Sequence, residues 1–97
     1  MRQWLAELEI VEADIAAIVA ASSEVAADAI EAGPVELHGV LAGADVVVRC
    51  NGPPEWGIED HPSRYVAALL VDDVAIDRSG DATAVVLRKA ASRGLGI

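Results

Sequence analysis

Phenylalanine is absent from this sequence, and its only aromatic residues are two tryptophans and one tyrosine. The hydrophobic fraction is nevertheless 54%, and alanine and valine supply much of it. Because large side chains contribute most of the free energy of burial, roughly 1.5 to 3 kcal/mol each, a core of small side chains predicts a monomer of modest stability. We therefore expect the chain to self-associate as a homo-oligomer or to bind a permanent partner.

Cysteine is almost absent too. Cys50 is the only one, so an intramolecular disulfide is impossible and the disulfide-rich secreted class is excluded. Long hydrophobic runs are missing near the N-terminus, where the longest uncharged stretch, residues 15–23, has nine residues. A membrane-spanning helix needs roughly 20, and acidic residues interrupt every stretch that could serve as an export signal. The sequence thus predicts a cytoplasmic protein with no membrane contact.

Basic residues are few: seven lysines and arginines stand against 16 acidic residues, which gives a formal net charge of -9. A negative field of this size disfavours direct binding to the phosphate backbone of nucleic acids. Residues 3–32 contain seven acidic residues and no basic one. This region therefore favours a protein partner with a basic surface.

The sequence contains no recognisable cofactor or metal motif. Gly52 is followed by two prolines, which lack the backbone N–H groups that a phosphate-binding loop needs. Two distant histidines and one cysteine do not have the spacing of a zinc site. We expect neither a cofactor nor a metal ion.

Helical periodicity fills residues 3–32, where apolar or small residues recur at alternating spacings of four and three. Gly33 and Pro34 supply a stop signal. The segment is either one helix or two helices that break near Ser22 and Ser23. Acidic residues flank the apolar stripe and would repel one another in a self-paired coiled coil, so we expect the stripe to pack on a sheet. The stripe consists of Trp4, Leu8, Val11, Ile15, Ile18, Ser22, Val25 and Ala29.

Between residues 35 and 51 the apolar period changes to two, and the pair Gly43-Ala44 suits a type II′ hairpin turn. With Ala42 opposite Asp45, the two faces of the hairpin separate cleanly. One face is apolar or small, and contains Leu37, Gly39, Leu41, Val46, Val48 and Cys50. The other contains Glu36, His38, Val40, Val47, Arg49 and Asn51.

Residues 51–64 contain several glycines and prolines, which interrupt helices and strands, so this segment is predicted to be a long loop. Strand-forming residues predict strands over residues 65–71 and 74–77. Residues 82–93 carry signals for both a strand and a helix, and a strand is slightly favoured. The whole chain, residues 1–97, is therefore predicted as one α+β domain, with an N-terminal amphipathic helix packed on an antiparallel sheet of about four strands.

Two features favour protein recognition. The acidic residues Glu7, Glu12, Asp14 and Asp28 form a candidate docking face for a basic partner, and Trp56 in the long loop is a candidate anchor. The alternatives are that these acids only solvate an amphipathic helix and that Trp56 closes the loop over the core.

Candidates for catalysis are weaker. They are His61, His38 and Arg49, in a cleft between the loop of residues 51–63 and the outer sheet face. Cys50 is expected to be a buried core residue on the face opposite His38, which excludes a Cys–His pair. The basic residues Arg88, Lys89 and Arg93 are expected to be attracted to the acidic helix.

The leading functional hypothesis is a small non-catalytic interaction protein of the inhibitor, immunity or adaptor type. A small enzyme or ligand-binding domain is the first alternative, so catalysis stays open, and a structural oligomer such as a phage or assembly component is the second. The bias toward alanine, valine, arginine and aspartate is typical of GC-rich coding and predicts a bacterial or phage source.

Overall fold

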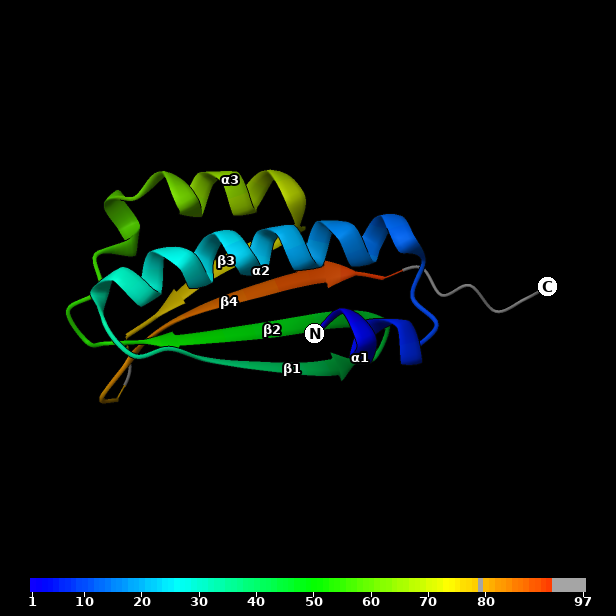
Figure 1. Cartoon of the computed structure of the whole chain (residues 1–97), viewed down its shortest axis with the longest axis horizontal. Helices are drawn as coiled ribbons and strands as arrows, with labels where there is room; N and C mark the ends of the chain where they lie inside the picture. The colour runs from blue at the N-terminus through cyan, green and yellow to red at the C-terminus, as the bar shows by residue number, and fades with distance from the viewer. Residues whose placement is uncertain (79, 92–97) are drawn as a thin grey trace.

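A four-stranded antiparallel sheet with helices on one of its faces makes up the computed structural model, which describes residues 1–78 and 80–91 (Figure 1). The predicted α+β class is confirmed. The elements are α1 (Arg2–Glu7), α2 (Glu12–Ala32), β1 (Glu36–Ala42), β2 (Asp45–Gly52), the 3-10 helix η1 (Ile58–Asp60), α3 (Pro62–Leu70), β3 (Asp73–Asp77) and β4 (Thr83–Ala90). None of the helices within the described residues combines the length and apolar character that a bilayer span requires.

The N-terminal helical region is interrupted between α1 and α2, so both expectations are wrong: it is neither one helix over residues 3–32 nor two helices that break near Ser22. Glu9 adopts a left-handed conformation with φ of 60°, and the N–H of Ile10 donates to the carbonyl of Leu5. This turn buries Ile10. Burial of that side chain explains why the chain bends here, while Ser22 stays buried in the middle of a continuous α2.

The predicted hairpin and its register are confirmed. Ala42 pairs with Asp45, and Gly43 has a φ of 64°, as the first central residue of a type II′ turn requires. Cys50 is fully buried on the face that packs against the helices. The prediction of an inward-facing Cys50 is therefore confirmed.

Residues 65–71 are not a strand, and that prediction is corrected. They belong to α3, which begins with Pro62 in its first turn, a position where a missing N–H costs nothing. Ser63 and Ala67 are buried, and α3 packs against α2. Residues 83–90 form β4, so the preferred strand assignment for that segment is confirmed.

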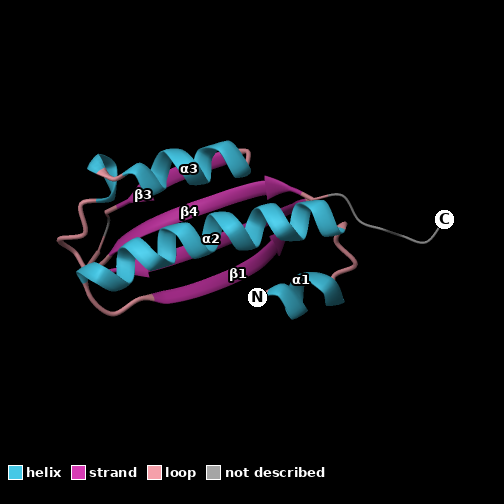
Figure 2. Ribbon diagram, turned by 45° about the horizontal axis from the view of Figure 1, so that its top comes forward, coloured by secondary structure: helices cyan, strands magenta, loops and turns pink. Residues whose placement is uncertain are grey.

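The strands lie in the order β1-β2-β4-β3, and α2 contacts the two central strands (Figure 2). The apolar stripe of α2 is buried there, as predicted. Two tryptophans each cover a glycine of the sheet. A Cβ atom on Gly39 would lie 2.6 Å from the Trp4 ring, and one on Gly52 would lie 2.5 Å from the Trp56 ring.

Candidate functional site

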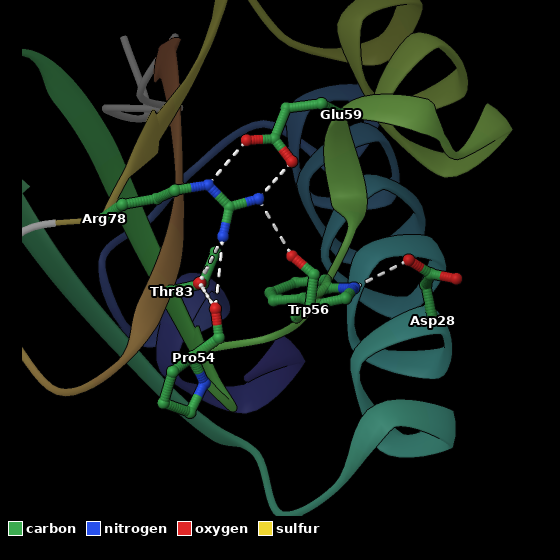
Figure 3. Close-up of polar contacts among 6 residues, drawn as sticks. All are labelled: Asp28, Pro54, Trp56, Glu59, Arg78 and Thr83. Carbon is green, nitrogen blue, oxygen red and sulfur yellow. Dashed lines mark hydrogen bonds and ion pairs between the residues drawn. The ribbon is translucent and has the colours of Figure 1, made fainter.

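A buried carboxylate near the end of α2 organises the candidate site. The side chain of Asp28 is 5% exposed. The indole N–H of Trp56 donates to its Oδ2 at 2.8 Å (Figure 3), and Nδ1 of His61 lies 2.7 Å from its Oδ1. A buried carboxylate is costly unless its oxygens are hydrogen-bonded. Asp28 meets that condition, and in doing so it fixes the positions of an indole and an imidazole.

Arg78 holds the loop that carries Trp56. Its guanidinium pairs with both carboxylate oxygens of Glu59 and donates from Nη2 to the Trp56 carbonyl at 3.0 Å (Figure 3). Its Nη1 donates to Thr83 Oγ1 at 2.8 Å, and the Thr83 hydroxyl donates to the Pro54 carbonyl at 2.9 Å. Hydrogen bonding to Arg78 lowers the pKa of Glu59, and the same hydrogen bonds raise the pKa of Arg78. The loop is thus tied to the neighbouring ends of β3 and β4.

Two hollows meet at Asp28, Glu31 and His61. The first is about 230 Å³ and is also lined by Ala32, Trp56 and Gly57. The second is about 190 Å³ and is also lined by Glu24, Ala27 and Ser63. We call the two together the acidic groove. It lies between the C-terminal half of α2 and the start of α3, and its carboxylates are Glu24, Asp28 and Glu31.

The structure brings three of the sequence candidates together, Asp28, Trp56 and His61. Trp56 is 2% exposed and Asp28 is 8% exposed, so neighbouring residues cover most of both side chains. The alternative, in which Trp56 closes the loop over the core, describes its position. His61 is half exposed and forms part of the groove wall.

The other predicted acids lie away from the acidic groove, at the N-terminal end of the helical layer. Glu12 forms an exposed ion pair with Arg2 at 2.5 Å, and Glu7 accepts a hydrogen bond from Gln3. Asp14 lies 3.8 Å from Lys89. Of the four candidate docking acids, Glu7, Glu12 and Asp14 therefore lie at one end of the helical layer, and Asp28 lies in the C-terminal half of α2.

The predicted basic cluster is also divided. Lys89 approaches Asp14 of α2, as expected, whereas Arg88 pairs with Asp45 of β2 at 2.8 Å. Arg93 lies outside the described residues. Attraction to the acidic helix is confirmed for Lys89 alone.

His38 and Arg49 lie opposite each other on the sheet face that carries no helices. Arg49 pairs with Asp77 at 2.9 Å, and His38 lies 3.3 Å from Glu36. His61 lies in the helical layer, so the sheet separates it from both. The predicted cleft that would combine His61, His38 and Arg49 does not form, because packing of Trp56 over Gly52 draws the loop onto the helical side.

Sequence reasoning overlooked Glu24 and Glu31. Together with Asp28 they follow a spacing of four and three residues, which places all three on one side of a helix. That spacing was the signal for an acidic groove. Arg78 gave no comparable signal, because its partners lie in segments that meet only in the folded protein.

The chemistry of the acidic groove favours binding of a cation. Within the described residues, His61 makes its polar contact with Asp28 and forms no hydrogen bond to a hydroxyl or thiol that could act as a nucleophile. No group of three or more metal-ligating side chains occurs among residues 1–78 and 80–91. The groove therefore offers carboxylates, an imidazole and an apolar indole floor.

The chain matches no protein-family model, no curated protein sequence and no solved structure.

Proposed function

We propose that this protein is a non-catalytic interaction protein of the inhibitor, immunity or adaptor kind, and that its acidic groove receives a lysine or arginine side chain of a partner protein. The observation that carries the proposal is the convergence of Glu24, Asp28 and Glu31 on hollows large enough for such a side chain. As part of the same proposal, the chain acts as a homo-oligomer, as its core of small side chains suggests.

The three carboxylates have different tasks in this proposal. Glu24 and Glu31 are exposed and attract a basic segment from a distance, which raises the rate of association. Asp28 is held by Trp56 and His61, so it does not need to reorganise when a cation arrives. A preorganised site loses less entropy on binding, and this favours affinity.

A small enzyme or ligand-binding domain is the second candidate, and one observation favours it. The 2.7 Å contact between Asp28 and Nδ1 of His61 is the arrangement by which a carboxylate orients an imidazole for general-base catalysis. On this alternative, His61 would be the catalytic residue and the acidic groove would hold a small substrate.

The test begins with the intrinsic fluorescence of Trp56, which forms the floor of the groove. In a Trp4→Phe background this indole is the only tryptophan. Short peptides with a central arginine or lysine are the probes, and matched peptides with glutamine are the controls. We expect the basic peptides alone to change the fluorescence, with an affinity that falls as salt concentration rises because the contact is between charges.

Paired charge variants locate the binding surface. Glu24→Gln with Glu31→Gln should weaken peptide binding severalfold, whereas Glu7→Gln with Glu12→Gln, an equal change of charge at the other end of the helical layer, should not. Equal weakening by both pairs would show that net charge and not the groove is responsible. The variant His61→Gln separates the two candidates. If it leaves the binding of basic peptides unchanged, and a neutral small molecule binds the groove of the wild-type protein but not of this variant, the second candidate replaces the first.

A further inference from the structure

The strand β1 is an outer edge of the sheet and has few of the features that usually protect an edge. Its sequence, ELHGVLA, contains no lysine and no proline, and its pairing with β2 is continuous from end to end. Leu37 is 43% exposed on the helical side and Val40 is 55% exposed on the opposite side. Exposed edges of this kind pair with other strands unless charges, prolines or bulges prevent it.

The hydrogen-bonding groups along this edge point outward at alternate residues. The two-residue turn makes Ala42 and Asp45 the closing hydrogen-bonded pair of the hairpin. Antiparallel ladders alternate between hydrogen-bonded and non-bonded pairs. The N–H and C=O groups of Leu37, Gly39 and Leu41 are therefore directed away from β2, where another extended strand could bind them.

An apolar hollow of about 300 Å³ lies beside the same edge, lined by Met1, Trp4, Leu37 and Gly39. The layer formed by α2 and α3 does not extend over β1, and the short α1 is the helix nearest to it (Figure 2). Trp4 reaches Gly39 but leaves Leu37 partly uncovered. A strand added to β1 would therefore find both backbone partners and a place for an apolar side chain.

We propose that a second copy of this chain occupies the edge, with the two β1 strands antiparallel and Gly39 opposite Gly39 of the second copy. The two four-stranded sheets then form one continuous sheet. This inference goes beyond the acidic groove and concerns a different surface.

The strand is self-complementary in this register. The segment Leu-His-Gly-Val-Leu is nearly symmetric about Gly39, so Leu37 faces Leu41 of the second copy and side chains stay on matching faces. Leu41 of the second copy then lies beside the hollow next to Leu37. A glycine at the centre of this register is compatible with the Trp4 ring that covers it, because a Cβ atom at this position would lie 2.6 Å from that ring.

Charge also selects β1 as the self-association surface. A chain with a net charge of -9 repels a second copy over most of its surface. The strand has a single acid, Glu36, which lies 3.3 Å from His38 and would face the uncharged Ala42 of the second copy. Like charges therefore do not meet along the paired strands.

A register-specific disulfide tests the arrangement. His38 would lie opposite Val40 of the second copy in a non-hydrogen-bonded pair, whose Cβ atoms are close enough for a disulfide. A mixture of the His38→Cys and Val40→Cys chains, treated with oxidised glutathione, should form the mixed dimer. Each variant alone should form far less disulfide-linked dimer. In the proposed register a cysteine is displaced by two positions from the same cysteine of the second copy and does not lie opposite it. The native Cys50 can remain, since it is buried.

Sedimentation velocity on the reduced wild-type protein gives the second measurement. We expect a dimer at tens of micromolar. Val40→Lys, which adds a charge to both copies at the paired edge, should weaken it by about tenfold or more. Ala75→Lys adds the same charge to the same sheet face on the other edge strand, β3, and should leave the dimer unchanged.

A monomer throughout this range, a dimer equally weakened by both lysine variants, or a dimer that yields no mixed disulfide would each overturn the proposal. Pairing of β1 with an extended peptide of another protein in place of a second copy would also overturn it. The variant with Glu24→Gln and Glu31→Gln should still dimerise, so failure of the acidic groove and failure of the β1 interface are distinguishable.

Discussion

Both tryptophans of this chain cover a glycine of the sheet, yet their surroundings differ. Trp56 is 2% exposed above Gly52, with its indole N–H bonded to Asp28 and its carbonyl bonded to Arg78. Trp4 is only partly buried above Gly39, and within the described residues its indole makes no hydrogen bond. Trp56 is almost completely buried although it lines the acidic groove, whereas the partly buried Trp4 borders an open hollow.

The difference shows how one structural device serves two purposes. A ring that covers a glycine brings a helix or loop close to the sheet, because no Cβ atom intervenes. At Gly52 the approach is completed by polar contacts and yields a rigid floor for the acidic groove. At Gly39 it is incomplete, and the exposed apolar surface beside it belongs to the edge that we propose as a dimer interface.

Truncation of each tryptophan should separate the two contacts most clearly. Trp56→Ala removes a buried ring and leaves Asp28 without its donor, so we expect a loss of about 3 to 5 kcal/mol in the free energy of unfolding. Trp4→Ala should cost roughly half as much, because that ring is already partly in water. Urea denaturation at low protein concentration measures both values. Equal losses would contradict the comparison.

Adding a methyl group to each glycine should change the free energy of unfolding less than truncating the tryptophans does. The loss should again be larger at the Trp56 contact than at the Trp4 contact. Gly52→Ala places Cβ within 2.5 Å of the Trp56 ring, which has no space to move, and should cost about 1 to 3 kcal/mol. Gly39→Ala creates a similar overlap with Trp4, but that ring can move toward solvent. We expect a change in stability below about 1 kcal/mol there, with a shift in Trp4 fluorescence. A larger cost at Gly39 would show that the Trp4 contact is also rigid.

Cys50 of β2 is paired with Leu37 of β1, but Cys50 is fully buried whereas Leu37 is 43% exposed. The pH dependence of stability tests the burial of Cys50. Burial raises the pKa of the Cys50 thiol from 9.0 to about 11. The unfolded chain therefore loses this proton first, so stability falls as pH rises above 9.0, by about 1.4 kcal/mol at pH 10. A Cys50→Ala variant measured in parallel should lack this part of the slope.

Thiol labelling gives an independent check on Cys50. A reagent should modify the folded protein much more slowly than the unfolded chain, because the buried thiol is both inaccessible and protonated. A cysteine placed at Leu37, which is 43% exposed, should react rapidly and serves as the matched control. Rapid labelling of native Cys50 would show that the layer over β2 opens.

The ion pair between Glu59 and Arg78 gives the smallest expected effect. Arg78 lowers the pKa of Glu59, so the pair stabilises the fold above the ordinary carboxyl value of 4.5 and loses this contribution as pH falls through the lowered pKa. Glu59→Gln should lower the melting temperature slightly at neutral pH and not at strongly acidic pH. Glu12→Gln breaks the more exposed ion pair with Arg2 and should have less effect.

Local patterns in the sequence predicted the parts of the fold that depend on local structure. The hairpin register followed from the Gly43-Ala44 pair and the period of two, and the stripe of α2 followed from its spacing. The strand predicted over residues 65–71 is wrong because that prediction depends on the strand propensity of residues such as Tyr65 and Val66. In the protein both are exposed, and the burial of Ser63 and Ala67 in a layer with α2 decides for a helix.

The candidate site was only partly predictable, because it depends on contacts between distant segments. The sequence makes Asp28 and Trp56 candidates for partner binding and His61 a candidate for catalysis, but nothing local indicates that the loop turns toward the helical side. That direction follows from the fit of Trp56 on Gly52 and from the bonds of Arg78, which lies 22 residues beyond Trp56 in the sequence. Side-chain packing over such separations is not encoded in periodicity.

The strand order β1-β2-β4-β3 has a consequence for the folding kinetics of the chain. Each outer pair is a hairpin of neighbouring segments and closes a short loop. The central ladder joins β2 to β4, with Gly52 paired to Thr83, and closes the long segment that contains α3. Closing a loop of that length lowers the conformational entropy of the chain before the contacts between β2 and β4 can form and compensate for it. Non-local strand pairing of this kind slows folding. Formation of the ladder between Asp45–Gly52 and Thr83–Ala90 is therefore the step that we expect to limit the folding rate.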